Sequence, residues 1–275
     1  MRADITVGQY CEGNSFLHRL NPKWKVLFAV VYITVIFLCK NVYSFLLLFL
    51  FTAALIAGSR INLKVFFRGL KSVIAVIAIT ALINIFWLRG ETEILHLGFI
   101  HIYLEGVINA VLIVVRVVLL ITGTSLLLTY TTTPIALTDG IEQFLAPLAK
   151  IKLPVHEFSM MMTIALRFIP TLIEETDKIM SAQKARGSDF SNGPLMKRAK
   201  ALIPILVPLF ISAFRRAGDL ATAMECRCYR GGDGRTRMNI LRSTWRDAVM
   251  LLMLCALCTG VVLVNKYAPG YKLSM

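Results

Sequence analysis

The sequence predicts an all-α integral membrane protein with about five transmembrane helices and three cytoplasmic or interfacial amphipathic helices, the last two forming a two-armed hairpin. Of its 275 residues, 57% are hydrophobic, and these are gathered in blocks. One soluble core of this length cannot bury so much apolar surface, so the excess must face lipid. The second observation is that residues 178–246 contain 14 Lys or Arg and only four acidic residues, which the positive-inside rule places in the cytoplasm.

Five apolar blocks have the composition of membrane spans, and they cover residues 26–39, 45–57, 72–88, 107–128 and 249–264. The first block is short, but the stems of Trp24, Lys25 and Lys40 can extend it by snorkelling. The loop 60–71 is basic and is expected inside, whereas the loop 89–105 has more acidic than basic residues and is expected outside. With the N-terminus inside, five crossings leave the C-terminus outside.

The chain is expected to have three parts. Residues 1–130 form a membrane portion with four spans, 131–245 form cytoplasmic or interfacial coupling helices, and 246–275 form a last span and tail. The first coupling helix covers 135–149 and starts at Pro134 behind a threonine cap. Two long arms follow, separated by a turn before Pro194. Within the second arm, 202–214 is short, apolar and contains two prolines, which favours an interfacial position; seven spans are the alternative.

One short pattern occurs twice, at the end of each arm. The two copies are Ala182-Gln-Lys-Ala-Arg186-Gly187-Ser188 and Ala223-Met-Glu-Cys-Arg227-Cys228-Tyr229, with the arginines 41 positions apart. An arginine at a helix C-terminus is also favoured by the macrodipole, which is the alternative interpretation. A dipole does not explain the repeated small neighbours, which let a partner approach the guanidinium and bind it through carboxylates or carbonyls. The pattern predicts a docking site at Ala185, Arg186, Gly187, Cys226, Arg227 and Cys228.

Each arm also carries an apolar stripe at helical spacing. The stripes contain Met161, Ala165, Phe168 and Leu172 in the first arm and Leu202, Leu206 and Leu209 in the second. Flexible methionines at 160–162 repack readily against different partners, which favours a binding face. The alternative is that the stripes only pack the arms on each other and on the lipid interface.

Two charge features remain. Arg116 lies near the middle of the fourth span, so it is expected to face other helices or an aqueous cavity; it is either part of a transport path or only an interhelical hydrogen-bond donor. The net charge of +14 is not accompanied by a nucleic-acid motif. Anionic lipid head groups and an acidic protein partner are therefore the expected counterparts.

No catalytic pattern is present. The chain lacks a phosphate-binding loop, and His156-Glu157 is not followed by a second histidine at helical spacing. No span contains paired acidic residues or histidines, which argues against a membrane enzyme. The six cysteines do not form a disulfide framework, and no metal site is predicted. A binding subunit without a cofactor of its own is expected.

At four places the chain resembles the transmembrane T component of energy-coupling factor transporters, the bacterial importers of vitamins and metals. These places are 15–22, Leu166-Arg-Phe-Ile-Pro170, the first arginine pattern and the second arginine pattern, in the family's order. The second pattern differs, because the family usually has Ala-Arg-Gly where this chain has Cys226-Arg227-Cys228.

The resemblance implies a multi-pass protein of the bacterial cytoplasmic membrane that pairs with two ATPases and a substrate-binding S component. ATP and Mg would be bound by the ATPases, which would hold the arm tips in grooves, and the two stripes would contact the S component. The S component would select the substrate, so this chain does not reveal it, nor whether several S components share it. The alternatives are a conventional permease subunit with its own substrate path and a passive scaffold, against which the repeated arginine tips argue.

Overall fold

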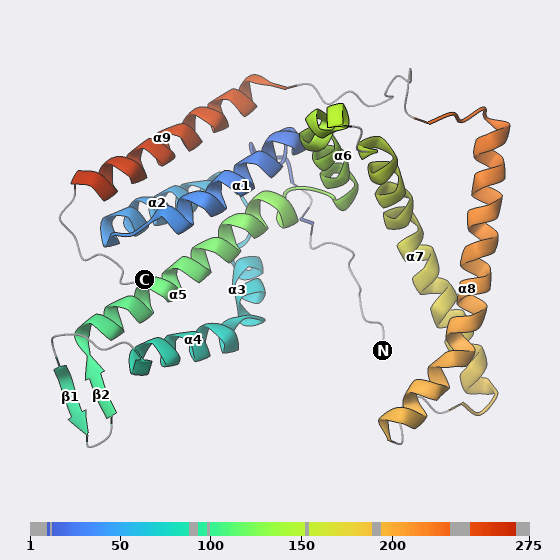
Figure 1. Cartoon of the computed structure of the whole chain (residues 1–275), viewed down its shortest axis with the longest axis horizontal. Helices are drawn as coiled ribbons and strands as arrows, with labels where there is room; N and C mark the ends of the chain where they lie inside the picture. Colours follow the sequence, from blue (N-terminus) through green and yellow to red (C-terminus); the bar gives the residue numbers. More distant parts are fainter. Residues whose placement is uncertain are drawn as a thin grey trace. The chain divides into compact units, whose positions relative to one another are not determined.

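The computed structural model describes residues 10–11, 13–87, 93–97, 100–151, 154–188, 194–231 and 243–267, and it confirms the helical class (Figure 1). The chain forms two compact units, Met1–Leu145 with Ile240–Met275, and Ala146–Asn239. The division predicted from sequence at 130 and 245 concerns coupling function and stays a prediction. Each unit is considered separately below.

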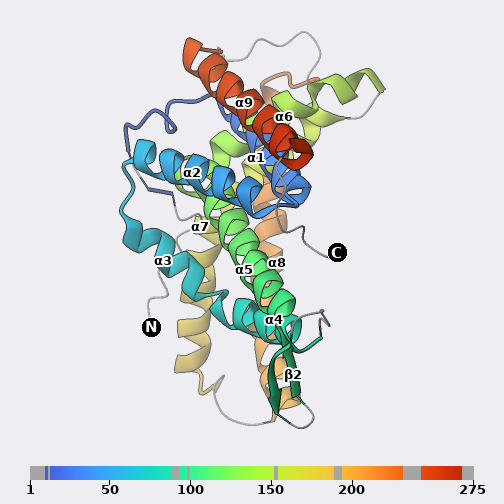
Figure 2. The same cartoon turned by 90° about the vertical axis from the view of Figure 1, so that its left-hand side faces the viewer.

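The first unit contains most of the predicted spans. Its elements are α1 (Pro22–Leu38), α2 (Val42–Ser59), α3 (Leu63–Lys71), α4 (Ile74–Trp87), β1 (Glu93–Leu97), β2 (Ile100–Tyr103), α5 (Leu104–Thr124), the π-helix η1 (Ser125–Tyr130), α6 (Pro134–Leu145) and α9 (Trp245–Tyr267). Helices α1, α2, α5 and α9 pack side by side (Figures 1 and 2). The second unit contains the 3-10 helix η2 (Ala146–Ile151), α7 (Val155–Ala185) and α8 (Leu195–Cys226).

Local sequence explains where the helices begin. Asn21 caps α1 by accepting a hydrogen bond from the Lys23 N–H, and Pro22 occupies the first position, where a missing N–H costs nothing. Thr133 caps α6 in the predicted way, since its hydroxyl oxygen accepts from the Ala136 N–H at 3.3 Å. The loop expected at 89–105 contains a short antiparallel hairpin, with His96 paired to His101, that the sequence analysis did not predict.

Four described helices are long and apolar enough to cross a membrane, or five if the bent pair α3 and α4 forms one span. The four are Val42–Ser59, Leu104–Tyr130, Lys200–Cys226 and Trp245–Tyr267. Two expectations differ from this result. Helix α1 has 17 residues, about 26 Å, which is shorter than a hydrocarbon core of about 30 Å. The predicted interfacial stretch 202–214 belongs to a helix long enough to span, because α8 continues through Pro204 and Pro208.

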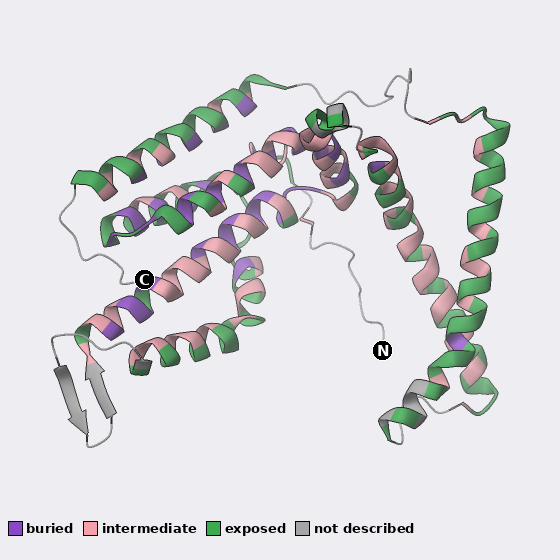
Figure 3. Ribbon diagram, in the orientation of Figure 1, coloured by how far each residue is buried: buried purple, intermediate pink, exposed green. Residues whose placement is uncertain are grey.

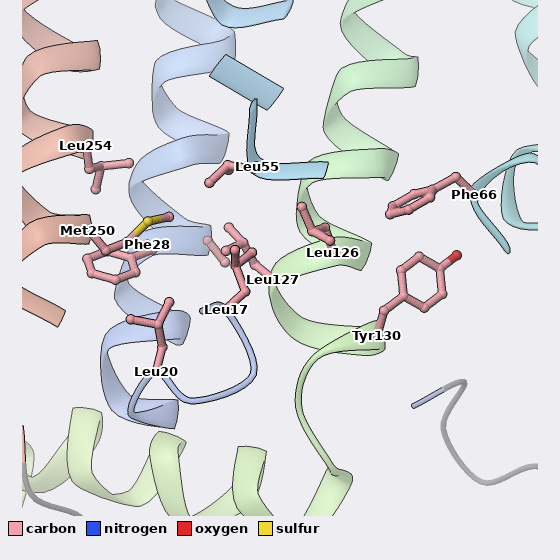
Figure 4. Close-up of a cluster of buried hydrophobic side chains, with 11 residues drawn as sticks. Leu17, Leu20, Phe28, Leu55, Phe66, Leu126, Leu127, Tyr130, Met250 and Leu254 are labelled. Atoms are coloured by element: carbon pink, nitrogen blue, oxygen red, sulfur yellow. The ribbon is translucent and has the colours of Figure 1, made fainter. Parts of the chain in front are cut away.

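The core of the first unit lies between α1, α2, α5 with η1, and α9. One cluster surrounds Phe28 and contains Leu17, Leu20, Leu55, Phe66, Leu126, Leu127, Tyr130, Met250 and Leu254 (Figure 4). A second cluster contains Tyr32, Ile36, Phe45, Leu48, Leu112, Leu119 and Val261. Buried residues follow the inner faces of α1, α2 and α5, while the outer faces are exposed (Figure 3). The apolar excess of the sequence is therefore on the outside, where lipid can cover it.

Polar side chains join distant segments at one end of this core. The Lys25 ammonium, 1% exposed, donates to the Thr131 carbonyl oxygen at 2.7 Å and to the Thr132 hydroxyl at 3.0 Å. The Asp247 carboxylate, 3% exposed, accepts from the backbone N–H groups of Asn21 and Thr244. These bonds tie the start of α1 to the chain after η1 and to the start of α9.

Helix α1 approaches α5 closely at Gly123. A Cβ built there would lie 2.3 Å from a ring carbon of Tyr32. Tyr32 is fully buried, and its hydroxyl donates to the Leu119 carbonyl at 3.1 Å and lies 2.8 Å from Thr52 Oγ1. The ring is therefore held by hydrogen bonds and cannot easily move aside.

We expect Gly123→Ala to destabilise the protein by roughly 1–3 kcal/mol, the cost of overpacking a filled core. The measurement is the thermal unfolding midpoint in detergent. Gly218→Ala in α8 is the matched control, because nothing lies within 4 Å of its Cβ and alanine favours a helix. An unfolding midpoint of Gly123→Ala at or above that of the unmodified protein would contradict the packing described here.

Candidate functional site

The two arms form an antiparallel helical pair within the second unit. Glu175 on α7 accepts a hydrogen bond from Arg216 on α8 at 2.9 Å, and Gln183 Nε2 donates to the Pro204 carbonyl at 3.4 Å. As positions increase along α7, their partners therefore decrease along α8, as Figure 1 shows. Residues 189–193 of the predicted turn lie outside the described residues.

Both arginine patterns end their helices with the same hydrogen-bonded cap. In the first, the Ser188 N–H bonds to the Gln183 carbonyl and the Gly187 N–H to the Lys184 carbonyl, both at 3.0 Å. In the second, the Tyr229 N–H bonds to the Met224 carbonyl at 3.0 Å and the Cys228 N–H to the Glu225 carbonyl at 2.8 Å. These are the two bonds of the Schellman motif, with the arginine as the C-cap residue in both.

The cap explains the residue after each arginine. A Schellman cap places that residue in the left-handed region, where Gly187 has φ +87° and Cys228 has φ +55°. Glycine adopts this conformation without strain, whereas a residue with a Cβ is disfavoured there by roughly 1–2 kcal/mol. The departure of the second pattern from Ala-Arg-Gly therefore keeps the backbone geometry at the expense of local stability.

The caps leave the predicted docking residues open to a partner. Ala185, Arg186, Gly187, Cys226, Arg227 and Cys228 are all exposed. No heavy atom lies within 4 Å of a Cβ built on Gly187. Because α7 and α8 are antiparallel, the two arginines lie at opposite ends of the pair. Gln183, close to the first tip, contacts Pro204, and the helix from Pro204 to Arg227 is about 35 Å long.

The structure separates the two apolar stripes that the sequence analysis considered together. Phe168 and Leu172 line a cavity of about 260 Å³ between the arms, opposite Ala217, Leu220 and Met224. Leu202, Leu206 and Leu209 lie further toward the other end, at the level of Pro204 and its contact with Gln183. Met161 is 58% exposed, Leu202 and Leu206 are 47% exposed, and Ala165 is exposed.

A broader exposed face runs along α8 beside the predicted stripe. Ile203, Val207, Phe210 and Phe214 recur at steps of four, three and four. Each is 52–74% exposed, with Val207 and Ile203 at the lower end of that range. Among the residues of α8 whose burial is described, Ile205 is the buried one. Periodicity finds an apolar face, but it does not reveal which of two adjacent faces the partner helix covers.

The Glu175–Arg216 pair was also missed, because residues 41 positions apart carry no local signal of contact. The pair lies where the arms meet, beside the cavity that Arg216 helps to line. Hydrogen bonding from Ser212 and the positive charge of Arg216 lower the pKa of Glu175, so its carboxylate is ionised at neutral pH. An ionised carboxylate holds the two arms at this point.

Arg116 lies on α5 in the first unit. One guanidinium nitrogen donates to the Cys39 carbonyl at 3.1 Å, and the group stands 5.4 Å from the ring centroid of Phe45. The arginine thus joins α5 to the turn between α1 and α2, and whether it has a role in transport stays a prediction. Among the described residues, no group of His, Cys, Asp or Glu is arranged to hold a metal ion.

The chain has clear relatives among known proteins. Residues 13–238 match the model of the CbiQ family, described as cobalt transport protein. The energy-coupling factor transporter transmembrane protein EcfT of Ruminiclostridium cellulolyticum is 52% identical over 265 residues, which cover 96% of this chain and 98% of that protein. Proteins of the same name from Clostridium kluyveri and Bacillus subtilis are 51% and 46% identical, each over 94% of this chain and 94% and 97% of their own length.

The class is therefore a multi-pass helical transport protein of the cell membrane. The chain belongs to the family of energy-coupling factor transporter transmembrane proteins. Membership favours the energy-coupling interpretation over a conventional permease with its own substrate path.

The geometry of the second cap makes a prediction about its cysteines. We expect Cys228→Gly to stabilise the end of α8 by roughly 0.5–1 kcal/mol, which is the left-handed penalty less the greater backbone freedom of glycine when unfolded. Cys226→Gly is the matched control, because the same change two residues earlier falls in helical backbone and should destabilise by a similar amount. Amide hydrogen exchange in the last turn of α8 measures both. Equal protection factors in the two variants would contradict the assigned cap.

Proposed function

We propose that the chain transmits ATP-driven motion of two ATPase subunits to a substrate-binding S component in the membrane. The observation that carries the proposal is the pair of equal caps, each of which presents an exposed arginine. A guanidinium has five N–H donors in a fixed fork, which suits the carboxylates or carbonyls of a groove on a partner. Two such tips at opposite ends of one helical pair suit two similar partners, one at each end.

Motion reaches the membrane through the helices themselves. When two ATPases approach each other on binding ATP, each carries one tip, and the ends of the arms move with them. The Glu175–Arg216 contact and the Gln183–Pro204 contact join the arms, so displaced ends change the angle at which the helices cross. A change in equilibrium requires contacts that differ between two states, and repacking at this crossing supplies them.

The chain itself is proposed to be non-catalytic. ATP and Mg would be bound by the ATPases, and no cofactor is assigned to this chain. The substrate, a vitamin or another micronutrient, would be selected by the S component. The exposed face with Phe210 and Phe214, together with Met161, Leu202 and Leu206, is the surface we assign to that component, because a partner that enters the bilayer can cover apolar side chains there.

Replacing the tip arginines tests the docking proposal. We expect Arg186→Ala and Arg227→Ala each to weaken ATPase binding by about 1.5–3 kcal/mol, the value of a hydrogen bond to a charged group. Co-purification of both ATPases and substrate uptake in vesicles are the measurements. The double variant should lose transport while its membrane portion stays folded.

Lys184→Ala and Arg230→Ala provide matched controls, since both are exposed cations close to the tips and only backbone groups form the hydrogen bonds of the caps. They should leave ATPase binding nearly unchanged. Full transport by the double arginine variant would disprove the docking mechanism.

Cross-linking tests the second surface. Cysteines introduced at Leu206 and Phe210 should cross-link to a co-expressed S component, because both side chains are exposed on one side of α8. Cysteine at Asp219, an exposed polar position later in the same helix, serves as the control. If neither apolar position forms a cross-link in a complex that still transports, the S component is held elsewhere.

A further inference from the structure

Helix α3 is held against the core by one face. Phe66 is 5% exposed and packs edge-to-face on Tyr130, with ring centroids 5.2 Å apart. On the same side, a Cβ built on Gly69 would lie 2.7 Å from the Tyr130 hydroxyl oxygen, so the helix approaches η1 closely. Figure 4 shows Phe66 and Tyr130 facing each other across this contact. The rotation of α3 about its axis is therefore determined.

The opposite face combines cations with apolar side chains. Lys64, Arg68 and Lys71 recur at steps of four and three and are exposed. Leu63 and Phe67 stand among them with 57% and 70% of their surface exposed. Arg60, also exposed, caps the preceding helix in the left-handed conformation, with φ +55°. A face of cations alone would be solvated by water. A phenylalanine exposed among cations is typical of a helix at the boundary between lipid head groups and acyl chains.

Helix α4 indicates the depth of this face in a membrane. Its exposed residues are apolar, namely Ile74, Val76, Ile79, Leu82, Ile83 and Phe86. Such a surface requires lipid or a protein partner, and hydropathy is high enough for α3 and α4 to pass as one broken span. The two helices meet at an angle of 63°. If α4 enters the hydrocarbon, α3 lies at a shallow angle near the membrane surface.

The Lys, Arg, Asp and Glu residues of α3 and of the chain before it, from Gly13 on, are all cationic. No Asp or Glu stands between Gly13 and Gly90 in the sequence, so nothing on this stretch of chain neutralises the four cations. The positive-inside rule places a segment this basic on the cytoplasmic side, where anionic lipids are enriched. We propose that the outward face of α3, formed by Arg60, Leu63, Lys64, Phe67, Arg68 and Lys71, binds the head groups of anionic phospholipids.

The two parts of the face have separate roles. Leu63 and Phe67 insert below the phosphates, while the cations, which are on the same side of the helix, meet the phosphates from above. Binding here fixes the elbow between α3 and α4 at the membrane surface. All residues of the proposed site belong to the first unit.

A photoreactive side chain tests the proposal at a single position. In the full chain, Phe67 is replaced by benzoylphenylalanine, which keeps an aromatic group, and the protein is reconstituted in vesicles of equal parts phosphatidylglycerol and phosphatidylcholine. We expect adducts with phosphatidylglycerol to dominate. The same replacement at Phe86 of α4 should capture both lipids equally, because acyl chains carry no head-group information.

Removing two cations tests the origin of the preference. Each cation near an anionic surface contributes roughly fivefold to binding, so Lys64→Gln with Arg68→Gln should lower the adduct ratio at position 67 by up to about 30-fold. Lys40→Gln with Lys266→Gln is the control pair. It removes the same charge from two exposed positions, one just after α1 and one in the last turn of α9, and should leave the adduct ratio unchanged. Thermal unfolding verifies that both variants are folded.

Three results would overturn the proposal. They are equal capture of the two lipids at position 67, an adduct ratio that survives loss of Lys64 and Arg68, and capture of a partner subunit in place of lipid in the intact transport complex. The last result would assign the face to an acidic protein surface.

Discussion

The buried ammonium of Lys25 is the interaction on which the first unit depends. A polar group inside an apolar bundle is costly unless it is hydrogen-bonded, and the Lys25 side-chain nitrogen contacts the Thr131 carbonyl and the hydroxyls of Thr131 and Thr132. The π-helix η1 ends next to these acceptors, so its last carbonyls are available to a side chain. Together with Asp247, which accepts from Asn21, this polar layer determines how α1, α5 and α9 meet.

Polar contacts of this kind allow the rest of the unit to be apolar on both its inner and outer surfaces. Tyr32 and Arg116 extend the same principle along the bundle, because each donates to a backbone carbonyl of another segment. The energy of such hydrogen bonds depends on direction, whereas apolar packing against lipid or against leucine has little directional preference. The helices are thus positioned by a few hydrogen bonds and stabilised by the surrounding apolar contacts.

In the second unit the corresponding constraint is the antiparallel pairing of two helices of nearly equal length. It places the two arginine tips far apart and makes each tip the end of a continuous helix, so a force applied to a tip is carried along the axis. The caps contribute by using the last carbonyls internally, which leaves the arginine side chains free for a partner. The second tip retains the cap geometry although Cys228, and not glycine, occupies the left-handed position.

The sequence alone determined the helical class, the starts of α1 and α6, the ends of α7 and α8, and the exposure of their tips. These features depend on apolar length and on hydrogen bonds within a few residues, which a linear pattern contains. Only the tertiary structure decided that Lys25 meets Thr131, that Glu175 meets Arg216, and that α3 turns its cationic face outward from Tyr130. The physical reason is that these partners are 41 to 106 positions apart, and such pairs are selected by the packing of whole helices and not by local preference.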